Sequence, residues 1–233
     1  TGACHRYGGG QCHCGSRGKF ITDIRPHGRG PGEWLGITDF TVDETDREII
    51  VTADRPYKFL YYDYNGNFLR EKTSEAFYTE ITRTTDNILA INSKVLEPKH
   101  YLSLLNEEDH RITVAKKIPL AFTYRGEFRC RGSYLLKSEH LYFTQNGDYT
   151  IYSWDNNRIK PVVTVDFGKY SYNPTQLNEE PHAPATRNKV LSIINVKEIR
   201  SNLFFNTNKI GLFVYNKTRH QIVHAYGITN TNL

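Results

Sequence analysis

A unit of four strand-like runs returns along this chain, and the repeat limits the folds that it can adopt. In the clearest copy the runs are GITDFTVDE, EIIVTAD, YKFLYYDY and NFLREKT, at residues 36–44, 48–54, 57–64 and 67–73. They are rich in β-branched and aromatic residues and largely alternate apolar with polar positions, as strands do. The last two runs are joined by Asn65-Gly66, a strong hairpin signal for which we expect positive φ at both residues.

Three further copies follow, separated by turns at a spacing of about 40 to 60 residues. Their runs lie at residues 76–84, 87–93, 100–106 and 111–118, then 133–139, 141–145, 149–155 and 159–167, and finally 190–196, 202–207, 211–216 and 221–227. Four-stranded antiparallel units at this spacing are typical of the blades of a β-propeller. A blade cannot bury both of its faces alone, so we expect the blades to stack around an axis.

The two ends of the chain are expected to share a blade. Residues 11–24 (QCHCGSRGKFITDI) are typical of the last two strands of a blade, and residues 227–233 (GITNTNL) can begin a first strand. Their pairing would remove exposed sheet edges, and it brings the blades that can be traced to about five. Residues 169–189, rich in Pro and Asn, predict a long surface excursion with one helical turn, and no linker divides the chain into domains.

The segment at residues 23–69, from DIRPHGRGPGEW to YYDYNGNFL, resembles one repeat of the NHL-like six-bladed β-propellers, particularly the exported proteins of Bacteroides and its relatives. The shared pattern is a glycine loop G-x-G-P-G-E with a following aromatic residue, an inner strand, a strand ending in Asp, a strand ending in an aromatic-Asp pair, and a Gly turn. The specific match covers about residues 17–70, and the remainder matches through its repeats.

This resemblance implies an all-β propeller of six blades in an extracytoplasmic setting, the periplasm or the cell surface, with its signal peptide removed. It implies no reaction. Because about five blades can be traced against six in the family, we expect a single propeller domain over residues 1–233 that is incomplete at one or both ends.

The glycine loop, residues 28–33 (GRGPGE), is interpreted as structural. Phosphate binding would require the loop to open a helix, whereas the following WLGITDFTVDE alternates with a period of two, as a strand does. We expect the loop to carry the chain from the outermost strand of one blade to the innermost strand of the next. Gly28, Gly30 and Gly32 permit positive φ, Pro31 would stiffen the passage, and Glu33 completes the loop.

Because strand directions alternate, the glycine loop and the turn ADRPY at residues 53–57 are expected to emerge on one face, at a mouth of the central channel. Exposed aromatic residues and arginines are typical of binding surfaces. The candidates for ligand contact on this face are therefore Arg29, Trp34, Arg55 and Tyr57. The alternative interpretation pairs Glu33 or Asp54 with an arginine and packs Trp34 between blades.

Charge and motif content exclude several classes of function. The net charge of +5 comes from basic residues scattered singly, without the stripe that nucleic acids require. No apolar run approaches the roughly 18 residues of a membrane span, and the N-terminus lacks a signal-peptide pattern. The hydrolase motifs G-x-S-x-G and H-E-x-x-H do not occur. We therefore expect a non-enzymatic binding or scaffold protein, without a cofactor, for a protein, peptide or glycan ligand.

The segment CHRYGGGQCHC, residues 4–14, groups three cysteines with two histidines, a ligand set suitable for zinc. It lacks the C-x2-C pairs of common closed sites, and Cys12 and Cys14 would share one face of a strand with His13 on the other. We therefore interpret these two cysteines as small buried residues and predict no metal site here. If the protein is exported, a disulfide that involves Cys4 or Cys130 is an alternative, and the sequence does not indicate the partner.

The alternative function is a metal-assisted hydrolase or lyase that holds Ca or Zn in the central channel. Asp54 and Asn92 end successive second strands and could begin a ring of ligands, whereas Gln145 and Thr207 stand at similar points and are weaker ligands. The oligomeric state and the identity of the ligand are not indicated by the sequence.

Overall fold

The computed structural model of the 233-residue chain describes residues 2–7, 11–16, 19–24, 27–91, 101–119, 135–137, 140–145, 148–155, 158–171, 188–209 and 211–225. At residues 2–7, 11–16, 19–21, 101 and 117–119 it describes the backbone alone. These residues fall into two compact units, one within Thr1–Lys94 and Tyr101–Pro119 and the other within Leu120–Leu233. Within the described ranges, no helix is long and apolar enough to cross a membrane.

The first unit begins with a three-stranded antiparallel sheet in the order β1(Gly2–Tyr7), β2(Gln11–Ser16) and β3(Lys19–Ile24). The prediction of two strands over residues 11–24 is confirmed by β2 and β3. The strand β1 was not predicted. The expected pairing of this sheet with residues 227–233 lies outside the described residues.

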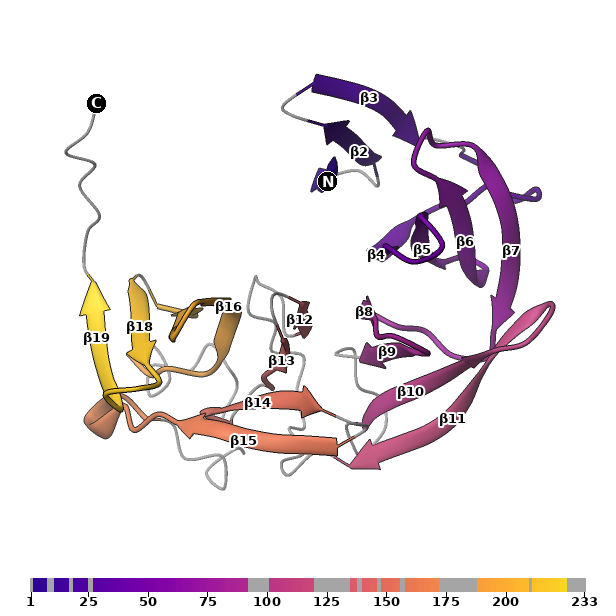
Figure 1. Cartoon of the computed structure of the whole chain (residues 1–233). Helices are drawn as coiled ribbons and strands as arrows, with labels where there is room; N and C mark the ends of the chain where they lie inside the picture. The colour runs from indigo at the N-terminus through magenta and orange to yellow at the C-terminus, as the bar shows by residue number, and fades with distance from the viewer. Residues whose placement is uncertain are drawn as a thin grey trace. The chain divides into compact units, whose positions relative to one another are not determined.

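Two four-stranded meanders complete the first unit, and each matches a predicted set of four runs (Figure 1). The first blade is β4(Ile37–Asp43), β5(Glu48–Asp54), β6(Tyr57–Asp63) and β7(Phe68–Ser74). The second blade is β8(Glu80–Arg83), β9(Ile88–Ile91), β10(Tyr101–Glu107) and β11(Arg111–Pro119). Neighbouring strands within each blade pair antiparallel.

The outermost strands of these two blades also pair with each other. Thr73 and Ser74 at the end of β7 are partners of Arg111 and Ile112 at the start of β11, in parallel orientation. The backbone N–H of Thr73 donates to the carbonyl of His110 at 3.0 Å. The two blades therefore form one continuous eight-stranded sheet.

Both faces of the first blade are buried, which explains why β5 and β6 read as nearly continuous apolar runs. On one face, Ile49, Val51 and Leu60 join a cluster that includes Ile24 of β3. On the other face, Phe59 and Tyr61 join a cluster with residues of the second blade, including Ile81, Ile88 and Leu105. Because successive side chains of a strand point to opposite faces, one run supplies both clusters.

The second unit contains the third blade, β12(Leu135–Lys137), β13(Leu141–Phe143), β14(Thr150–Asp155) and β15(Arg158–Thr164), and the fourth blade, β16(Ile193–Ile199), β17(Asn202–Thr207), β18(Leu212–Asn216) and β19(Gln221–Ala225). Both are antiparallel meanders at the predicted positions. A shared cluster, which includes Ile151 of the third blade with Leu203 and Phe205 of the fourth, packs them together.

The predicted excursion at residues 169–189 begins with the 3₁₀ turn η1(Gly168–Tyr170), and residues 172–187 lie outside the described ranges. Its two ends are held together, because the N–H of Val190 donates to the carbonyl of Tyr170 at 2.8 Å. Ser171 and Val190 also form a parallel bridge. The two described ends of this segment therefore lie side by side in the second unit.

The β6–β7 turn corrects one prediction. Gly66 has φ +85, as expected, but Asn65 is not among the residues with positive φ. The Asp63 N–H donates to the Asn67 carbonyl at 3.0 Å, and the Asp63 carboxylate accepts the N–H groups of Asn65 and Asn67 at 2.8 and 2.9 Å. The loop is therefore one residue longer than a two-residue hairpin, and such loops need positive φ only at their last residue.

Candidate functional site: the loop face of the first blade

The glycine loop and the β5–β6 turn meet on one face of the first blade, as their strand directions predicted. The backbone N–H of Asp54, the last residue of β5, donates to the carbonyl of Gly36 at 3.1 Å. A Cβ atom at Gly36 would lie 2.7 Å from the Asp54 carboxylate, so a larger residue there would have to displace the Asp54 side chain. We call the surface formed by residues 27–36 and 54–57 the loop face.

The glycine loop closes on itself through hydrogen bonds. The Gly28 N–H donates to the Trp34 carbonyl at 3.0 Å, and the Glu33 N–H donates to the Gly30 carbonyl at 3.1 Å. The Glu33 carboxylate in turn accepts the Gly30 N–H at 2.8 Å. The amide groups that would cradle a phosphate are thus partly satisfied within the loop, and β4 follows it rather than a helix.

The ion pair of Lys58 and Glu71 in the first blade holds the glycine loop through hydrogen bonds. Lys58 is only 4% exposed, and its ammonium group lies 2.8 Å from the Glu71 carboxylate. The same ammonium group donates to the Gly30 carbonyl at 3.2 Å, and Glu71 accepts the Gly32 N–H at 2.9 Å. Burial raises the pKa of Glu71, but the hydrogen bonds from Lys58 and Gly32 outweigh it, so the pKa is lowered.

All three loop glycines permit positive φ, but only one of them adopts it. Gly32 has φ +73, whereas Gly28 and Gly30 are not among the glycines with positive φ. Gly28 leaves room for a side chain instead: a Cβ there would lie 2.0 Å from the Glu33 carboxylate, so a larger residue would have to displace the Glu33 side chain. Close packing of Glu33, rather than a positive φ, therefore favours glycine at position 28.

Trp34 lies in the core. It is 3% exposed, belongs to the cluster with Ile24 and Leu60, and its ring meets that of Tyr62 edge-on at a centroid distance of 6.0 Å. This is the packing role that the alternative interpretation gave it, between the N-terminal sheet and the first blade. As placed here, Trp34 has almost no surface to offer a ligand.

The other candidates stand at the surface. Arg29 is exposed, the Arg55 side chain is 72% exposed, and Tyr57 is 46% exposed. The Tyr57 ring contacts the ring of Phe77, which follows β7, at a centroid distance of 5.7 Å and an interplanar angle of 51°. The Arg55 Nε lies 3.5 Å from the Asp54 carboxylate, so one of the two predicted acid-arginine pairs is found. Glu33 instead bonds the backbone of its own loop.

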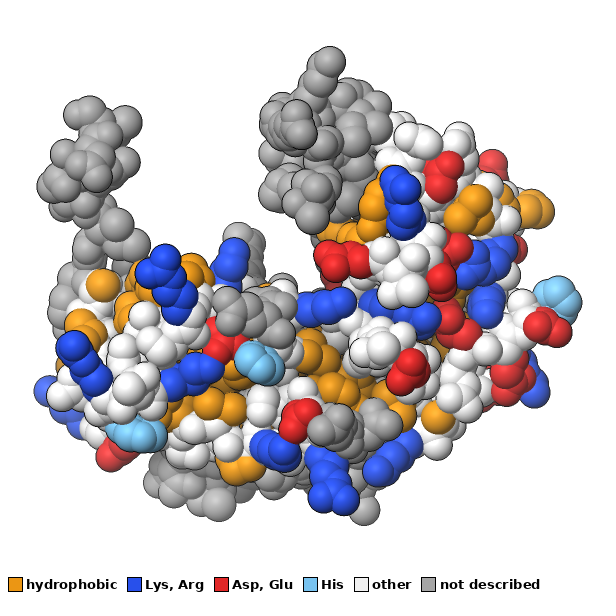
Figure 2. All heavy atoms as spheres, in the orientation of Figure 1, with side chains coloured by type: hydrophobic (Ala, Val, Ile, Leu, Met, Phe, Trp, Pro, Cys, Tyr) orange, Lys and Arg blue, Asp and Glu red, His pale blue; other side chains and the backbone are white. Residues whose placement is uncertain are grey.

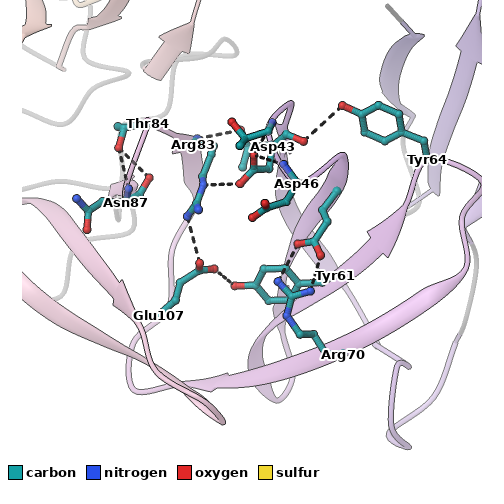
Figure 3. A network of polar contacts seen from close by, with 12 residues as sticks. Asp43, Asp46, Tyr61, Tyr64, Arg70, Arg83, Thr84, Asn87 and Glu107 are labelled. Carbon is teal, nitrogen blue, oxygen red and sulfur yellow. Dashed lines mark hydrogen bonds and ion pairs between the residues drawn. The ribbon is translucent and has the colours of Figure 1, made fainter.

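A buried polar network, which the sequence did not indicate, lies between the first and second blades (Figure 3). The Arg83 guanidinium pairs with Asp43 at 2.7 Å and with Glu107 at 3.1 Å, and the Tyr61 hydroxyl donates to Glu107. Arg70 lies over the Tyr61 ring at 4.1 Å. Burial and the neighbouring Glu107 raise the pKa of Tyr61 far above its ordinary value, so it stays neutral. The network braces two blades.

The second unit has a smaller network of the same kind. The Glu198 carboxylate of β16 is almost fully buried, at 1% side-chain exposure, and accepts the Tyr142 hydroxyl at 2.8 Å. It also pairs with His140 at 2.6 Å and with Lys217. His140 and Tyr142 are close to each other in the sequence but stand 58 and 56 residues before Glu198, so no local motif could reveal the network.

The metal-assisted alternative depended on residues that end the second strands. Asp54 ends β5, Thr207 ends β17, and Gln145 follows β13, whereas Asn92 lies outside the described residues. Where side chains are described, no group of three His, Cys, Asp or Glu residues could hold a metal ion. On the face of the first unit visible in Figure 2, basic and acidic side chains are intermixed.

Consecutive four-stranded antiparallel blades, packed face to face within each unit, define the class: the protein is a β-propeller. Its sequence matches the family described as domain of unknown function DUF4934 over residues 15–232, and the chain belongs to this family. No protein of curated function matches the sequence.

Solved structures share the fold at low sequence identity. A predicted exported protein of Bacteroides fragilis matches with a TM-score of 0.70 and 17% identity, over 92% of this chain and 65% of that one. BamB of Moraxella catarrhalis matches with a TM-score of 0.50 and 12% identity, over 95% and 56%. A chain of a nidogen–laminin complex matches with a TM-score of 0.50 and 12% identity, over 91% and 70%. The chain thus spans less than two thirds of the first two.

These comparisons confirm the propeller class and the likeness to a predicted exported protein of Bacteroides. The NHL-like character and the number of six blades remain predictions.

Proposed function

We propose that this protein is a non-enzymatic binding propeller, exported from the cell, that presents its loop face to a protein, peptide or glycan. The observation that carries the proposal is the pair Arg55 and Tyr57, exposed at 72% and 46% on a turn whose surroundings are held in place. Arginine and tyrosine are enriched among the residues that dominate binding energy.

Rigidity of the loop face supports a binding role. Asp54 is tied to Gly36, the Tyr57 ring rests on Phe77, and the glycine loop is held by Lys58 and Glu71. A surface that is ordered before a ligand arrives loses less conformational entropy on binding. Arg29 is exposed on the same loop and extends the surface.

The likenesses support the rest of the proposal. The similarity to a predicted exported protein favours an extracytoplasmic location. The similarity to a chain crystallised in a nidogen–laminin complex favours a protein or peptide as the first ligand class to test. No residue of the loop face is assigned a chemical step.

A pull-down from a cell-surface extract, run beside a glycan array, tests the proposal. The double variant Arg55→Ala/Tyr57→Ala should weaken a partner by about 2 kcal/mol or more per side chain if both are central to the interface. The matched control is Arg158→Ala/Tyr170→Ala, which removes an exposed arginine and a 51% exposed tyrosine from the second unit. A partner that both folded double variants retain equally would place the ligand elsewhere.

A further inference from the structure

Lysine and arginine side chains gather at one end of the two blades of the second unit. Because neighbouring strands are antiparallel, the β12–β13 and β14–β15 turns emerge at the same end of the third blade, and the β16–β17 and β18–β19 turns do so in the fourth. We call the described residues of 137–141, 155–160, 198–202 and 216–221 the basic turn face. Its Lys, Arg, Asp and Glu residues are Lys137, Asp155, Arg158, Lys160, Glu198, Arg200, Lys217 and Arg219.

The turns of the two blades lie side by side. His140 of the β12–β13 turn places its Nδ1 2.6 Å from the carboxylate of Glu198, near the end of β16. Lys217 of the β18–β19 turn pairs with the same carboxylate, and its backbone N–H donates to the Ser201 carbonyl at 2.8 Å. Both blades therefore contribute to one surface.

Most of the positive charge on the basic turn face has no opposite charge beside it. The Glu198 side chain is 1% exposed and lies against Lys217, and Asp155 pairs with Lys160 at 2.5 Å. The remaining charged side chains are all basic and exposed, and none forms an ion pair with a described residue: Lys137, Arg158, Arg200 and Arg219. Lys and Arg side chains also predominate over acidic ones on the face of the second unit visible in Figure 2.

The corresponding turns of the first unit carry the opposite charge. Glu44 and Asp46 lie in the β4–β5 turn, Glu108 and Asp109 lie in the β10–β11 turn, and all four are exposed. Hairpin turns at this end of the blades thus have no general need of basic residues. The fold alone does not explain the charge of the basic turn face.

Arg200 occupies a backbone position that favours other residues. Ile199 is the partner of Asn202 in the pairing of β16 with β17. The turn between them consists of Arg200 and Ser201, and Arg200 has φ +56, in the left-handed region where Asn and Gly are preferred. Residues held in that region against their preference point to a function. The exposed charge of Arg200 accounts for its place better than turn chemistry does.

An anionic polymer with apolar rings suits this face. Guanidinium groups match carboxylates and similar oxyanions through two parallel hydrogen bonds, and charges spread over four turns suit a ligand whose charges repeat along a chain. Single-stranded nucleic acids are held by aromatic side chains on which bases stack, and the described part of this face has no exposed Phe, Tyr or Trp. Ile199, 48% exposed beside Arg200, offers an apolar contact to a sugar ring.

We propose that the basic turn face of the second unit binds an acidic polysaccharide, one whose sugars carry carboxylate or sulfate groups. This surface is distinct from the loop face, whose residues belong to the first unit, so either assignment can fail without the other.

Calorimetric titration at low ionic strength tests the proposal, with heparin as the sulfated probe and polygalacturonate as the carboxylated one. We expect at least one of them to bind, with an affinity that falls as salt is added because salt screens exposed charges. Neutral dextran should not bind. The double variant Arg200→Asn/Arg219→Gln should lower the affinity about tenfold or more, since each arginine supplies charge-assisted hydrogen bonds.

The matched control is Arg47→Asn/Arg111→Gln. It removes the same charge from the corresponding turns of the first unit, and Arg47 also has positive φ, at +58. This control should keep the affinity of the wild type. Arg200→Asn alone should have a urea midpoint at or above that of the wild type, because asparagine tolerates the left-handed region better than arginine does. Its loss of affinity would then not come from unfolding.

Three results would each overturn the proposal. The first is a wild type that binds neither polysaccharide. The second is a control that loses as much affinity as Arg200→Asn/Arg219→Gln, which would show that net charge alone governs binding. The third is tighter binding, through these same arginines, of poly-L-glutamate or of an oligodeoxythymidylate than of either polysaccharide, which would identify an acidic peptide or a nucleic acid as the ligand.

Discussion

The pair Lys58 and Glu71 is expected to be a main support of the glycine loop, and Glu71→Gln tests this with little change of shape. The variant removes the charge opposite an ammonium group that is 4% exposed. Breaking a buried ion pair costs about 3–5 kcal/mol. Because the Glu71 side chain is 34% exposed, water can reach the vacated position, and we expect a loss of about 2–3 kcal/mol.

Urea denaturation measures this loss as a lower transition midpoint. In thermal unfolding it corresponds to a decrease of about 5–10 °C for a chain of this size. The lowered pKa of Glu71 adds a pH dependence. The stabilisation should be complete above the ordinary glutamate pKa of about 4.3 and should vanish as the pH falls through the lower pKa of the folded state. The difference between wild type and variant should therefore shrink in acid.

The control is Glu108→Gln. Glu108 forms an exposed pair with Arg111 at 2.8 Å, with side-chain exposures of 46% and 59%. Solvent screens such a pair, so the variant should be as stable as the wild type. Adding Lys58→Met to Glu71→Gln should restore stability, because it removes the unpaired buried charge. If Glu71→Gln has the same urea midpoint as the wild type, or if the double variant is less stable than the single one, Lys58 and Glu71 do not stabilise the glycine loop as a buried ion pair.

Three further predictions concern the backbone, the tyrosines and the core. Gly32→Ala should lower the free energy of unfolding, measured by urea denaturation, more than Gly168→Ala does. Both residues have positive φ, which costs alanine about 1–2 kcal/mol. A Cβ at Gly32 would also meet the Phe68 ring at 3.0 Å, whereas none of the described atoms lies within 4 Å of a Cβ at Gly168. Burial raises the pKa of Tyr78 and of Tyr152 to about 12, so their tyrosinate absorbance should appear late in an alkaline titration. Stability should fall as the pH rises from about 10, where unfolded tyrosine ionises, towards 12. Trp34→Ala should cost about 3–5 kcal/mol, and a cost below 1 kcal/mol would be incompatible with its buried position.

Much of the fold could be predicted because the composition and the flanking turns of each strand-like run indicate a strand without reference to the rest of the chain. The bounds predicted for β5, residues 48–54, are those observed, since charged residues and a turn enclose a run that is apolar except for Thr52. The strand β1 escaped prediction because GACHRY contains no β-branched residue and only one aromatic. It is defined by its pairing with β2, which is a property of the sheet.

Of the loop face, the sequence predicted the exposed side chains whose exposure follows from their position at a turn. Arg55 and Tyr57 lie at the surface because they flank the β5–β6 turn. The burial of Trp34 depends on Ile24 and Tyr62, and that of Lys58 depends on Glu71 and the loop above it. Such contacts join residues distant in sequence, which alternation and turn signals do not encode.

The parallel pairing of β7 with β11 has a consequence for how the protein opens. Outer strands of separate sheets would fray independently, whereas here the exposed Thr73 is held to His110 by its N–H and by its hydroxyl, at 3.0 and 3.2 Å. Amide hydrogen exchange reports such coupling, because amides that open only in a larger unfolding event exchange together. The Thr73 amide should therefore be as slow as those of the neighbouring inner strands, and the first two blades should exchange as one cooperative body.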